Sequence, residues 1–518
     1  MHGCNNNKLL WGLACSWVLF GCPESPVVAD IGPAPTAEAG PSDAGAADAS
    51  VPVDASAPDA GPPPTGLAWS RDLPNTSYGS PRLFESEDGP ELLLSFGAVF
   101  GNRTPGAVIG GAISVSATSG DVAWQIDRNA ELFSLALPVQ SHSGFDNLYL
   151  FGGKRGVLMA VDVETGVMHY QTEPYGDASR TAGIWNYYTG LQARDINADG
   201  VGEIVITNGG DDYADVGDPR PPGWLEVLDG TTLDVIHRLA VPLAAETYSS
   251  PTLWVRAGVA YVIYGTGGET LPGSLFMVPM ESILAGTLDG QVELIEPIAD
   301  FGCIAPPAYA DLDGDGALEM IVTPFDGRLI VFSGATAEIL WERETQARRE
   351  TAASPIVGDF DGDGDLDIFT SLTQGQFPVW TGSEIRVFDG RTGEVLFEDS
   401  VDGDILIGTA VAADVDGDQV DEVLFARSSL PETMQDPNWS ELSILHTDEQ
   451  RIEVIGEQEG LVGSAGWVGD ADEDGYLEWY VTTNSITVSR LVRYNLSGRT
   501  PQRIAWGGYL GTRHDGKY

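Results

Sequence analysis

Short stretches of alternating apolar and polar residues recur along the chain, each interrupted by a turn. Five of them place a turn containing Gly, Thr or Asp between two alternating runs: "VSATSGDVAW" (115–124), "VDVETGVMHY" (161–170), "VLDGTTLDVI" (227–236), "VFSGATAEILW" (331–341) and "VFDGRTGEVLF" (387–397). Alternation with a period of two directs one set of side chains inward, and such turns join neighbouring strands. Each stretch is therefore predicted to form a β-hairpin, and no helical period is sustained after residue 66.

A second kind of segment is an acidic cluster followed at once by an apolar run. The five examples are "DINADGVGEIVIT" from Asp195, "DLDGDGALEMIVT" from Asp311, "DFDGDGDLDIFT" from Asp359, "DVDGDQVDEVLFA" from Asp414 and "DADEDGYLEWYVT" from Asp470. The last four begin 48 to 56 residues apart. The segment 249–265, and others near residues 146 and 87, have the flanking strand pattern without the full acidic frame. The chain thus contains eight units of roughly 50 residues, a period typical of propellers and solenoids.

Each unit supplies two strands around its acidic segment and two more in its later hairpin. Four antiparallel strands per unit are typical of a propeller blade. We therefore expect an all-β propeller of eight blades, with seven blades as the alternative. Two segments, "GLAWSRDL" (66–73) and "RIAWGGY" (503–509), have the pattern of a blade's outer strand, and either could complete the last blade.

The N-terminus has the features of a targeting segment. Lys8 precedes the apolar run "LLWGLACSWVLF" (9–20), which suits a signal-peptide core and is too short to span a bilayer. The run ends in "LFGC" (19–22), which resembles the lipobox of bacterial lipoproteins; the alternatives are a plain secretory signal and a chance Cys after an apolar run. The resemblance implies a signal peptide over 1–21 and acylation of Cys22. Because Pro23 follows rather than Asp, it also implies an outer-membrane lipoprotein of the bacterial cell envelope, facing the periplasm or the cell surface.

Residues 22–65 are predicted to be a disordered linker rich in Ala, Pro and Asp. This stretch contains no aromatic residue and no Lys or Arg. It cannot bury enough apolar surface to offset the entropy lost on ordering. As a flexible coil it would reach on the order of 35 Å. We therefore expect the propeller to occupy 66–518 and to be held away from the membrane.

The charge balance is strongly acidic, with 77 Asp and Glu against 26 Lys and Arg and a formal net charge of -51. Such a chain is repelled by nucleic acid and by anionic membrane surfaces, and it attracts divalent cations. Beyond the N-terminal segment Cys303 is the single cysteine, which excludes a disulfide framework in the body. We expect no nucleic-acid partner, and contact with a membrane only through the lipid anchor.

The acidic segments share a frame of candidate metal ligands. Positions 1, 3 and 5 carry Asp or Asn, position 6 is usually Gly, and position 9 is Asp or Glu. Oxygen atoms at alternate positions converge when the backbone wraps around a hard divalent cation; without an ion, the acids would raise one another's pKa values. An EF-hand would need a bidentate Glu at position 12, where this chain has Ile206, Val322, Thr370, Phe425 and Val481. The site is therefore predicted to lie in a β-hairpin and to be closed by the acid at position 9.

The frame D-x-[DN]-x-D-G-x-x-[DE] followed by a strand resembles the FG-GAP/VCBS repeats of integrin α-subunit propellers and of bacterial surface proteins. In that family the loop joins the first two strands of a blade and binds calcium. The resemblance implies five calcium sites here, with Asn197 in place of an acid and Gln419 in place of the turn Gly. The implied ligands are Asp195, Asn197, Asp199, Glu203, Asp311, Asp313, Asp315, Glu319, Asp359, Asp361, Asp363, Asp367, Asp414, Asp416, Asp418, Glu422, Asp470, Asp472, Asp474 and Glu478.

The sequence offers few candidates for catalysis. It contains no H-x-x-x-H pair, G-x-S-x-G elbow or P-loop, and His169, His237 and His446 stand singly in strand-like runs, as ordinary surface or core residues do. The later hairpins and "WGGYLGTRHDGKY" (506–518) are similar to quinoprotein-type propeller repeats, but the vicinal disulfide of quinone-dependent dehydrogenases has no counterpart here. We assign no catalytic residue.

We therefore expect a monomeric binding protein, rather than an enzyme, for a protein or carbohydrate ligand at the cell surface. The insertions 207–224, 371–383 and 427–440 are the candidate binding segments, because loops on a rigid scaffold usually carry recognition. Their Trp and Tyr residues suit a binding surface, with packing between blades as the alternative. The other functions left open are an envelope-assembly scaffold and a polysaccharide lyase or hydrolase, for which the basic run 343–350 is the candidate patch.

Overall fold

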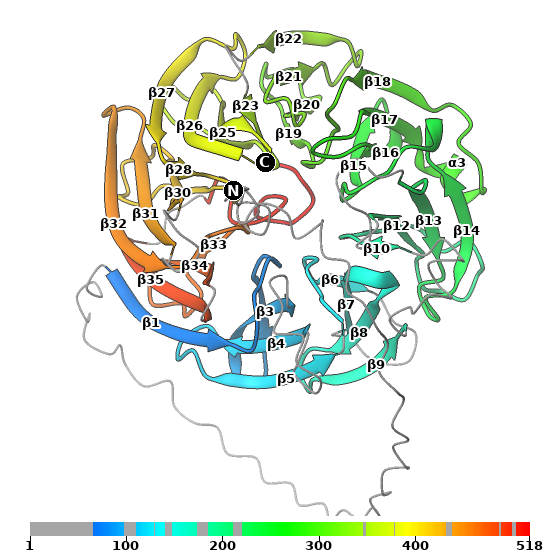
Figure 1. Ribbon diagram of the computed structural model, residues 1–518, viewed down its shortest axis with the longest axis horizontal. Helices are drawn as coiled ribbons and strands as arrows, with labels where there is room; N and C mark the ends of the chain where they lie inside the picture. Colours follow the sequence, from blue (N-terminus) through cyan, green and yellow to red (C-terminus); the bar gives the residue numbers. More distant parts are fainter. Residues whose placement is uncertain are drawn as a thin grey trace, which may run out of the picture.

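The computed structural model describes residues 66–97, 110–128, 130–139, 148–172, 185–210, 220–344, 349–377, 379–430, 438–485, 488–499 and 504–518. Within these ranges the strands form eight antiparallel sheets, arranged as blades around a central axis (Figure 1). The predicted eight-bladed, all-β propeller is confirmed, and the alternative of seven blades is excluded. The predicted signal peptide, Cys22 and the linker lie outside the described residues.

Blades are numbered 1 to 8 from β2, and each runs from an innermost strand beside the axis to an outer strand at the rim (Figure 1). The innermost strands are β2 (Arg82–Ser86), β6 (Leu137–Val139), β10 with β11 (Asn186–Tyr187, Leu191–Gln192), β15 (Thr252–Arg256), β19 (Ala308–Ala310), β23 with β24 (Arg349–Glu350, Ile356–Gly358), β28 with β29 (Asp404–Ile405, Val411–Ala413) and β33 (Trp467–Gly469). The second strands are β3 (Gly89–Gly97), β7 (Leu148–Gly152), β12 (Ile204–Gly209), β16 (Val259–Gly265), β20 (Glu319–Val322), β25 (Asp367–Gln376), β30 (Glu422–Ser429) and β34 (Tyr476–Asn484).

The remaining strands follow in the same order of blades. The third strands are β4 (Gly110–Ser116), β8 (Leu158–Asp162), β13 (Trp224–Leu228), β17 (Gly273–Pro279), β21 (Leu329–Phe332), β26 (Val379–Asp389), β31 (Trp439–His446) and β35 (Ser489–Arg499). The outer strands are β5 (Val122–Arg128), β9 (Val167–Gln171), β14 (Val235–Ala240), β18 (Val292–Ile298), β22 (Ile339–Arg343), β27 (Val395–Asp402), β32 (Arg451–Glu459) and β1 (Gly66–Leu73). Helical structure among the described residues is limited to η2 (Lys154–Gly156), η3 (Pro242–Ala244) and α3 (Met280–Leu284). None of the described helices has the length and apolar character needed to cross a membrane.

The middle strands are buried on both faces, whereas the outer strands are partly exposed. In blade 5 every residue of β20 and β21 is buried, while β22 is exposed or half-buried throughout. Each sheet is packed between its two neighbours, so apolar side chains on both faces of the middle strands enter a core. This packing explains why the runs "EMIV" and "LIVF" show no clear alternation.

The N-terminal strand closes the ring. β1 pairs antiparallel with β35 and places Trp69 opposite Arg493, so the two ends of the fold share one sheet. The alternative, in which 503–509 forms this outer strand, is wrong because β1 already occupies the edge of β35. The described part of that segment lies in the axial channel instead (Figure 1). There Trp506 is fully buried and pairs antiparallel with Ala412 of β29.

Tryptophan side chains tie several blades to the next one. The indole N–H of Trp69 donates to the carbonyl oxygen of Ala117 at 3.2 Å, and that of Trp341 donates to Gly390 at 3.0 Å. Trp124 makes the equivalent bond to blade 2. In blades 5 and 8 an Arg two residues further along donates to a carbonyl of the same turn. A W-x-R pattern in an outer strand thus marks contact between blades, a signal that the sequence analysis missed.

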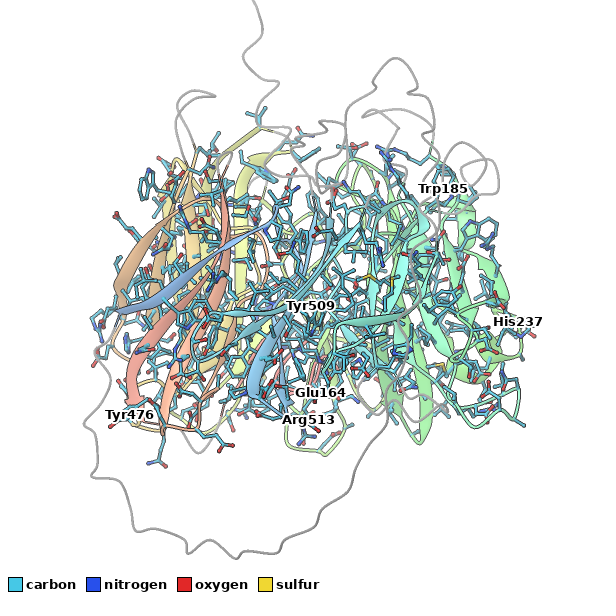
Figure 2. The ribbon with its side chains drawn as sticks, turned by 90° about the horizontal axis from the view of Figure 1, so that it is seen from below. Glu164, Trp185, His237, Tyr476, Tyr509 and Arg513 are labelled. Carbon is cyan, nitrogen blue, oxygen red and sulfur yellow. The ribbon has the colours of Figure 1, made fainter. Side chains whose placement is uncertain are left out.

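The strand order separates the connections onto two faces. Because successive strands alternate in direction, first-to-second and third-to-fourth connections lie on one face, and all others lie on the opposite face. Tyr476, at the start of β34, lies near the lower edge in Figure 2, whereas Trp185, ahead of blade 3, lies near the upper edge. We call the face that carries 311–319 the loop face and the face that carries 371–383 the insertion face.

Candidate metal centres

All five acidic segments lie in loops between the innermost and second strands of a blade, as the family resemblance implied. They follow β11, β19, β24, β29 and β33, in blades 3, 5, 6, 7 and 8. Glu319, Asp367 and Glu422, at position 9, are the first residues of their second strands. The predicted hairpin geometry is confirmed, and the five loops share the loop face.

Hydrogen bonds within each loop hold the carboxylates in place. In blade 5 the Asp311 carboxylate accepts the N–H of Gly314 at 2.8 Å and that of Gly316 at 3.0 Å. Glu319 closes the loop by accepting the N–H of Leu312 at 2.9 Å. The equivalent closing bonds of the other four loops measure 2.8–3.0 Å. These bonds use only part of each carboxylate's accepting capacity, so other lone pairs remain for an ion.

Four of the five loops gather three acidic side chains whose oxygen atoms lie within 4.8 Å of one another. The groups are Asp311, Asp313 and Asp315; Asp359, Asp361 and Asp367; Asp414, Asp416 and Asp418; and Asp470, Asp472 and Glu478. A further group joins Asp416 and Glu422 to His446. The other predicted ligands of these loops, Glu319, Asp363 and Asp474, belong to the same loops but lie outside the groups.

Burial makes the charges of the closing acids unfavourable. In blade 6, burial and then repulsion from Asp361 raise the pKa of Asp367, 2% exposed, to about 8. Burial likewise raises the pKa of Glu319 in blade 5. Repulsion from neighbouring acids contributes to these raised pKa values, as expected, but burial is the larger cause. A bound divalent cation would relieve both effects.

His446 adds a nitrogen atom beside the blade 7 loop. Its Nδ1 lies 3.5 Å from Glu422 Oε1 and 4.0 Å from Asp416 Oδ2, because the β30–β31 register sets it next to Glu422. Burial raises the pKa of Glu422 to about 7, and the hydrogen bond to Glu422 raises the pKa of His446. His446 is therefore a candidate ligand or charge partner, which its isolated place in the sequence did not indicate.

The blade 7 loop also departs from the others in its turn. Gln419 has φ 82°, where the other four loops have Gly at φ between 86° and 90°. The turn therefore forms without Gly, but it holds an L-residue in the left-handed region, which costs about 1–2 kcal/mol.

In the blade 8 loop an arginine lies among the acids. Arg493 of β35 places Nη2 2.8 Å from Asp472 Oδ2 and 3.3 Å from Glu478 Oε1. The Arg493 side chain is 6% exposed, and its guanidinium also donates to the carbonyl of Ala117 in blade 1. Burial still raises the pKa of Glu478 to about 8. The guanidinium supplies part of the positive charge that an ion would bring.

In the blade 3 loop the side-chain amide of Asn197 lies among the acids, as the guanidinium of Arg493 does in blade 8. The Asn197 side-chain N–H₂ donates to Asp229 Oδ2 at 2.8 Å and to Asp199 Oδ2 at 3.3 Å. The predicted acids Asp195, Asp199 and Glu203 are not among the described groups that converge within 4.8 Å. The loop keeps the hydrogen-bonded shape of the others, and its own amide donates to one of its acids, Asp199.

The loops of blades 5, 6 and 7 fit a hard divalent cation best. Their donors are carboxylate oxygens, with the imidazole of His446 as a nitrogen neighbour. Among the described residues, no Lys or Arg forms an ion pair with the grouped acids of blades 5 and 6. Several carboxylates gathered on one loop match the coordination that calcium prefers, six to eight oxygen atoms, better than the strict octahedron of magnesium.

The predicted binding segments lie at second-to-third strand connections on the insertion face. The segment 371–383 extends β25 and β26 into a long hairpin, where Trp380 is buried and donates to Glu350 at 3.0 Å. For Trp380, the alternative of packing between blades is therefore correct, rather than a place on a binding surface. Trp439, in contrast, is 48% exposed. Residues 211–219 and 431–437 of the other two insertions lie outside the described residues.

Other candidate reactive groups are packed into the scaffold. Arg343 donates to the carbonyl of Gly393 at 2.7 Å, and Arg349 pairs with Glu384 at 2.6 Å, so the described ends of the basic run bind protein groups. Residues 345–348 lie outside the described residues. Burial raises the pKa of the Cys303 thiol to about 12, which makes it a poor nucleophile.

A comparison with protein families finds an FG-GAP-like repeat over residues 307–370, which include the blade 5 and blade 6 loops. No curated protein matches the chain.

Among solved structures, the chain is similar to the quinohemoprotein alcohol dehydrogenase ADHIIG from Pseudomonas putida, with 12% identity, 85% of this chain and 77% of that chain covered, and a TM-score of 0.53. It is also similar to a europium-containing methanol dehydrogenase, with 9% identity and a TM-score of 0.52. This match covers 83% of this chain and 93% of that chain. BamB from Moraxella catarrhalis matches with 13% identity and a TM-score of 0.44, and the match covers 83% of this chain and 99% of that chain. At these identities the two dehydrogenases show a shared fold alone.

Proposed function

Because the chain is a β-propeller that carries an FG-GAP-like repeat, we propose that it is a calcium-stabilised binding protein of the bacterial cell envelope. In this proposal the loop face holds calcium, the insertion face binds a protein or carbohydrate ligand, and acyl chains on Cys22 anchor the chain to the outer membrane. The observation that carries the proposal is the gathering of carboxylates at the same place in the neighbouring blades 5, 6 and 7.

Calcium binds most tightly in blades 5, 6 and 7 and more weakly in blades 3 and 8. In these two blades the Asn197 amide donates to Asp199 and the Arg493 guanidinium pairs with Asp472, so each competes with an ion for a predicted ligand. The test is the calcium content of the mature chain after dialysis against micromolar calcium. About three ions per chain are expected to remain if the tight sites have affinities near those of sensor-type sites. A chain that retains no calcium would contradict the proposal.

The geometry of the ring supports different roles for its two faces. The acidic loops and their ions lie on the loop face, which leaves the insertion face for recognition. Trp439 begins β31 on that face and is 48% exposed, so its ring is available to pack on a ligand.

Binding without turnover distinguishes this proposal from an enzyme. The mature chain would be passed over immobilised cell-envelope polysaccharides and envelope proteins, and the polysaccharide eluates assayed for new reducing or unsaturated ends. Retention without new ends is expected, and Trp439→Ala should weaken it several-fold, whereas Ile339→Ala, equally exposed at the rim, should not. New chain ends would favour a lyase or hydrolase, and absence of retention on every matrix would overturn the binding role.

The position of β1 supports the proposed tether. β1 lies at the rim of the ring, so the proposed tether would join the propeller at its outer edge, at Gly66 (Figure 1). The test is metabolic labelling with radioactive palmitate in a bacterial host, followed by membrane fractionation. The wild-type chain should carry label and sediment with the outer membrane, and Cys22→Ser should lose both properties. An unlabelled wild-type chain would contradict the lipid anchor.

A further inference from the structure

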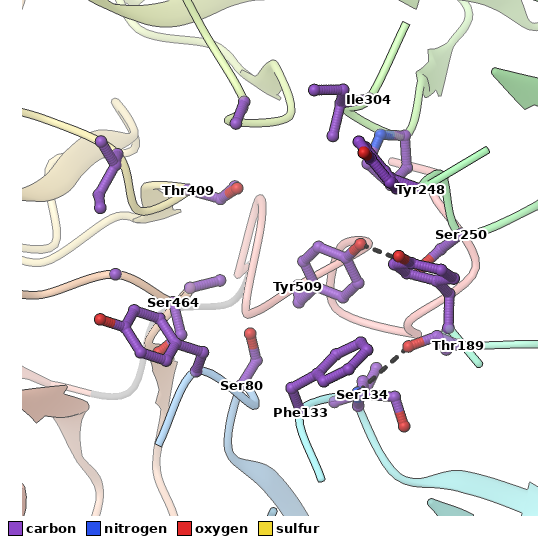
Figure 3. Close-up of a pocket in the computed structure, with 18 residues that line it drawn as sticks. Ser80, Phe133, Ser134, Thr189, Tyr248, Ser250, Ile304, Thr409, Ser464 and Tyr509 are labelled. Carbon is purple, nitrogen blue, oxygen red and sulfur yellow. Dashed lines mark hydrogen bonds between the residues drawn. The ribbon is translucent and has the colours of Figure 1, made fainter. Parts of the chain in front are cut away.

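A cavity of about 190 Å³ lies on the propeller axis (Figure 3). The lining residues of the blades come from the turns that precede the innermost strands or, in blades 3, 6 and 7, from the turns between the two innermost strands. Blades 1 to 4 place aromatic rings there, Tyr78, Phe133, Tyr188 and Tyr248, whereas blades 5 to 8 contribute aliphatic or small residues. The cavity therefore has one aromatic side and one aliphatic side, although the scaffold around it is a regular ring.

The C-terminal segment forms one wall of this cavity and fixes a further aromatic ring in it. Tyr509 projects into the middle of the cavity, and its hydroxyl donates to Ser250 Oγ at 3.3 Å (Figure 3). The backbone around it is held by blade 7 through Trp506 and by blade 8 through the bond from Val468 N to Gly507 O at 2.9 Å. The Tyr509 ring is therefore held in place by the packed backbone on its N-terminal side.

Hydroxyl groups around the cavity retain hydrogen atoms for a ligand. Ser134 Oγ accepts the N–H of Gly152 at 2.6 Å, and Thr189 Oγ1 accepts that of Leu135 at 3.1 Å. Thr409 Oγ1 similarly accepts a backbone N–H, from blade 6, at 3.2 Å. A hydroxyl that accepts such a bond still has its own O–H to donate. Three side chains from three blades therefore offer donors at the cavity wall.

The described residues that line the cavity include no charged side chain. A ligand with an ionised group would lose its hydration there without gaining a partner, which is strongly unfavourable. Rigid aromatic faces suit the C–H surface of a saturated ring, and the hydroxyls suit a ligand that accepts several hydrogen bonds. The volume is below the range of about 300–1,000 Å³ typical of drug-sized ligands, which favours a single small ring.

We propose that the axial cavity binds one neutral sugar ring, such as a hexose unit, between Tyr509 and the aromatic side of the channel. This inference deepens the proposed binding function and rests on it, because it assigns a carbohydrate subsite to the same protein. The subsite is separate from the calcium loops and from Trp439.

The test uses the mature chain in calcium and a panel of methyl glycosides of neutral hexoses, each paired with the corresponding uronic acid. Saturation-transfer NMR detects binding, and titration gives the dissociation constants. At least one neutral hexoside should bind, and its uronate should bind at least about tenfold more weakly, because no cation offsets the buried carboxylate. Thr409→Val should weaken hexoside binding about five- to tenfold, the effect of one lost hydrogen bond, and Tyr509→Ala should weaken it further.

Matched controls lie in the same fold away from the cavity. Thr447→Val, at a buried threonine of the same blade as Thr409, and Tyr170→Ala on an outer strand should leave hexoside binding unchanged. The proposal is overturned if no neutral hexoside binds, if uronates bind equally well, or if Thr409→Val and Tyr509→Ala bind as the wild type does. Retention on envelope matrices is measured with the same proteins: if it persists while hexoside binding is absent, only the axial subsite fails. If wild-type retention is itself absent, the proposed function fails.

Discussion

Replacing Arg493 with Met should convert the blade 8 loop into a calcium-dependent one. The guanidinium lies 2.8 Å from Asp472 and 3.3 Å from Glu478 and is almost completely buried. Removing one partner of a buried ion pair costs about 3–5 kcal/mol, because the remaining charge has no compensation. Unfolding entropy of about 2.1 cal/mol/K per residue amounts to about 1 kcal/mol/K for a ring of this size that unfolds as one unit. The melting temperature in chelator should therefore fall by about 3–5 °C.

Calcium should restore part of that loss in Arg493→Met. An ion at 100 times its dissociation constant stabilises the folded state by about 2.7 kcal/mol, so the calcium-induced rise in melting temperature should exceed that of the wild type by about 2–3 °C. The assay is scanning calorimetry in chelator and in calcium. Arg427→Met is the control, because Arg427 is equally buried and pairs with Asp399 at 2.5 Å, outside the acidic loops. An equal calcium increment in wild type, Arg493→Met and Arg427→Met would refute the idea that the guanidinium occupies an ion's place.

Four further predictions concern the loops and the axial segment. Asp367→Asn should raise the melting temperature in chelator by about 1–3 °C, because folding no longer has to protonate or bury this carboxylate, and should lower it in calcium, where a ligand is lost. The same sign in both buffers would contradict the assignment. In chelator, thermal stability should fall as pH rises from 5 to 8: the folded-state pKa values of Asp367, Glu422 and Glu478, about 8, 7 and 8, exceed their unfolded values, so the folded chain binds protons that the unfolded chain releases. Bound calcium should make this pH dependence less steep. An equally steep fall with and without calcium would argue against calcium binding at these acids. Gln419→Gly should stabilise the chain by about 1 kcal/mol, seen as a rise of about 1 °C with or without calcium. Trp506→Ala should cost about 3–5 kcal/mol and expose the C-terminal segment to proteolysis, whereas resistance equal to the wild type would show that the segment is not held in the channel.

The sequence predicted the fold and the loops because their signals repeat in one frame. Each acidic segment is followed by a strand, and the closing acid lies within two residues of the start of that strand, so position and chemistry could be inferred together. The eightfold count was predicted from the period of roughly 50 residues even where the acids were missing, as in the segment 249–265.

The sequence did not predict contacts that depend on pairing between distant segments. His446 reaches Glu422, and Arg493 reaches Asp472, only because the register of the blade sets them side by side. The sequence also left open which segment closes the ring. Two segments had the pattern of an outer strand, and only the structure shows which of them pairs with β35. Trp380 was placed on a binding surface because its loop is long, but Glu350 and the neighbouring blades bury it.

The axial cavity could not be inferred from any local pattern. Blades 1 to 4 contribute one aromatic residue each, 55 to 60 residues apart in the sequence, and only the closed ring brings these residues together. With the blade frame known, Tyr188 and Ile304 stand seven residues before the first Asp of their acidic segments, so this position can be found in related sequences.

The melting temperature of the mature chain in excess chelator, before and after calcium is added back, tests the central claim most directly. Three tight sites at 100 times their dissociation constants should together stabilise the ring by about 8 kcal/mol, or about 8 °C. The account predicts a fall of this size in chelator and full recovery on addition of calcium, with magnesium at the same concentration restoring much less. An unchanged melting curve in chelator would contradict it.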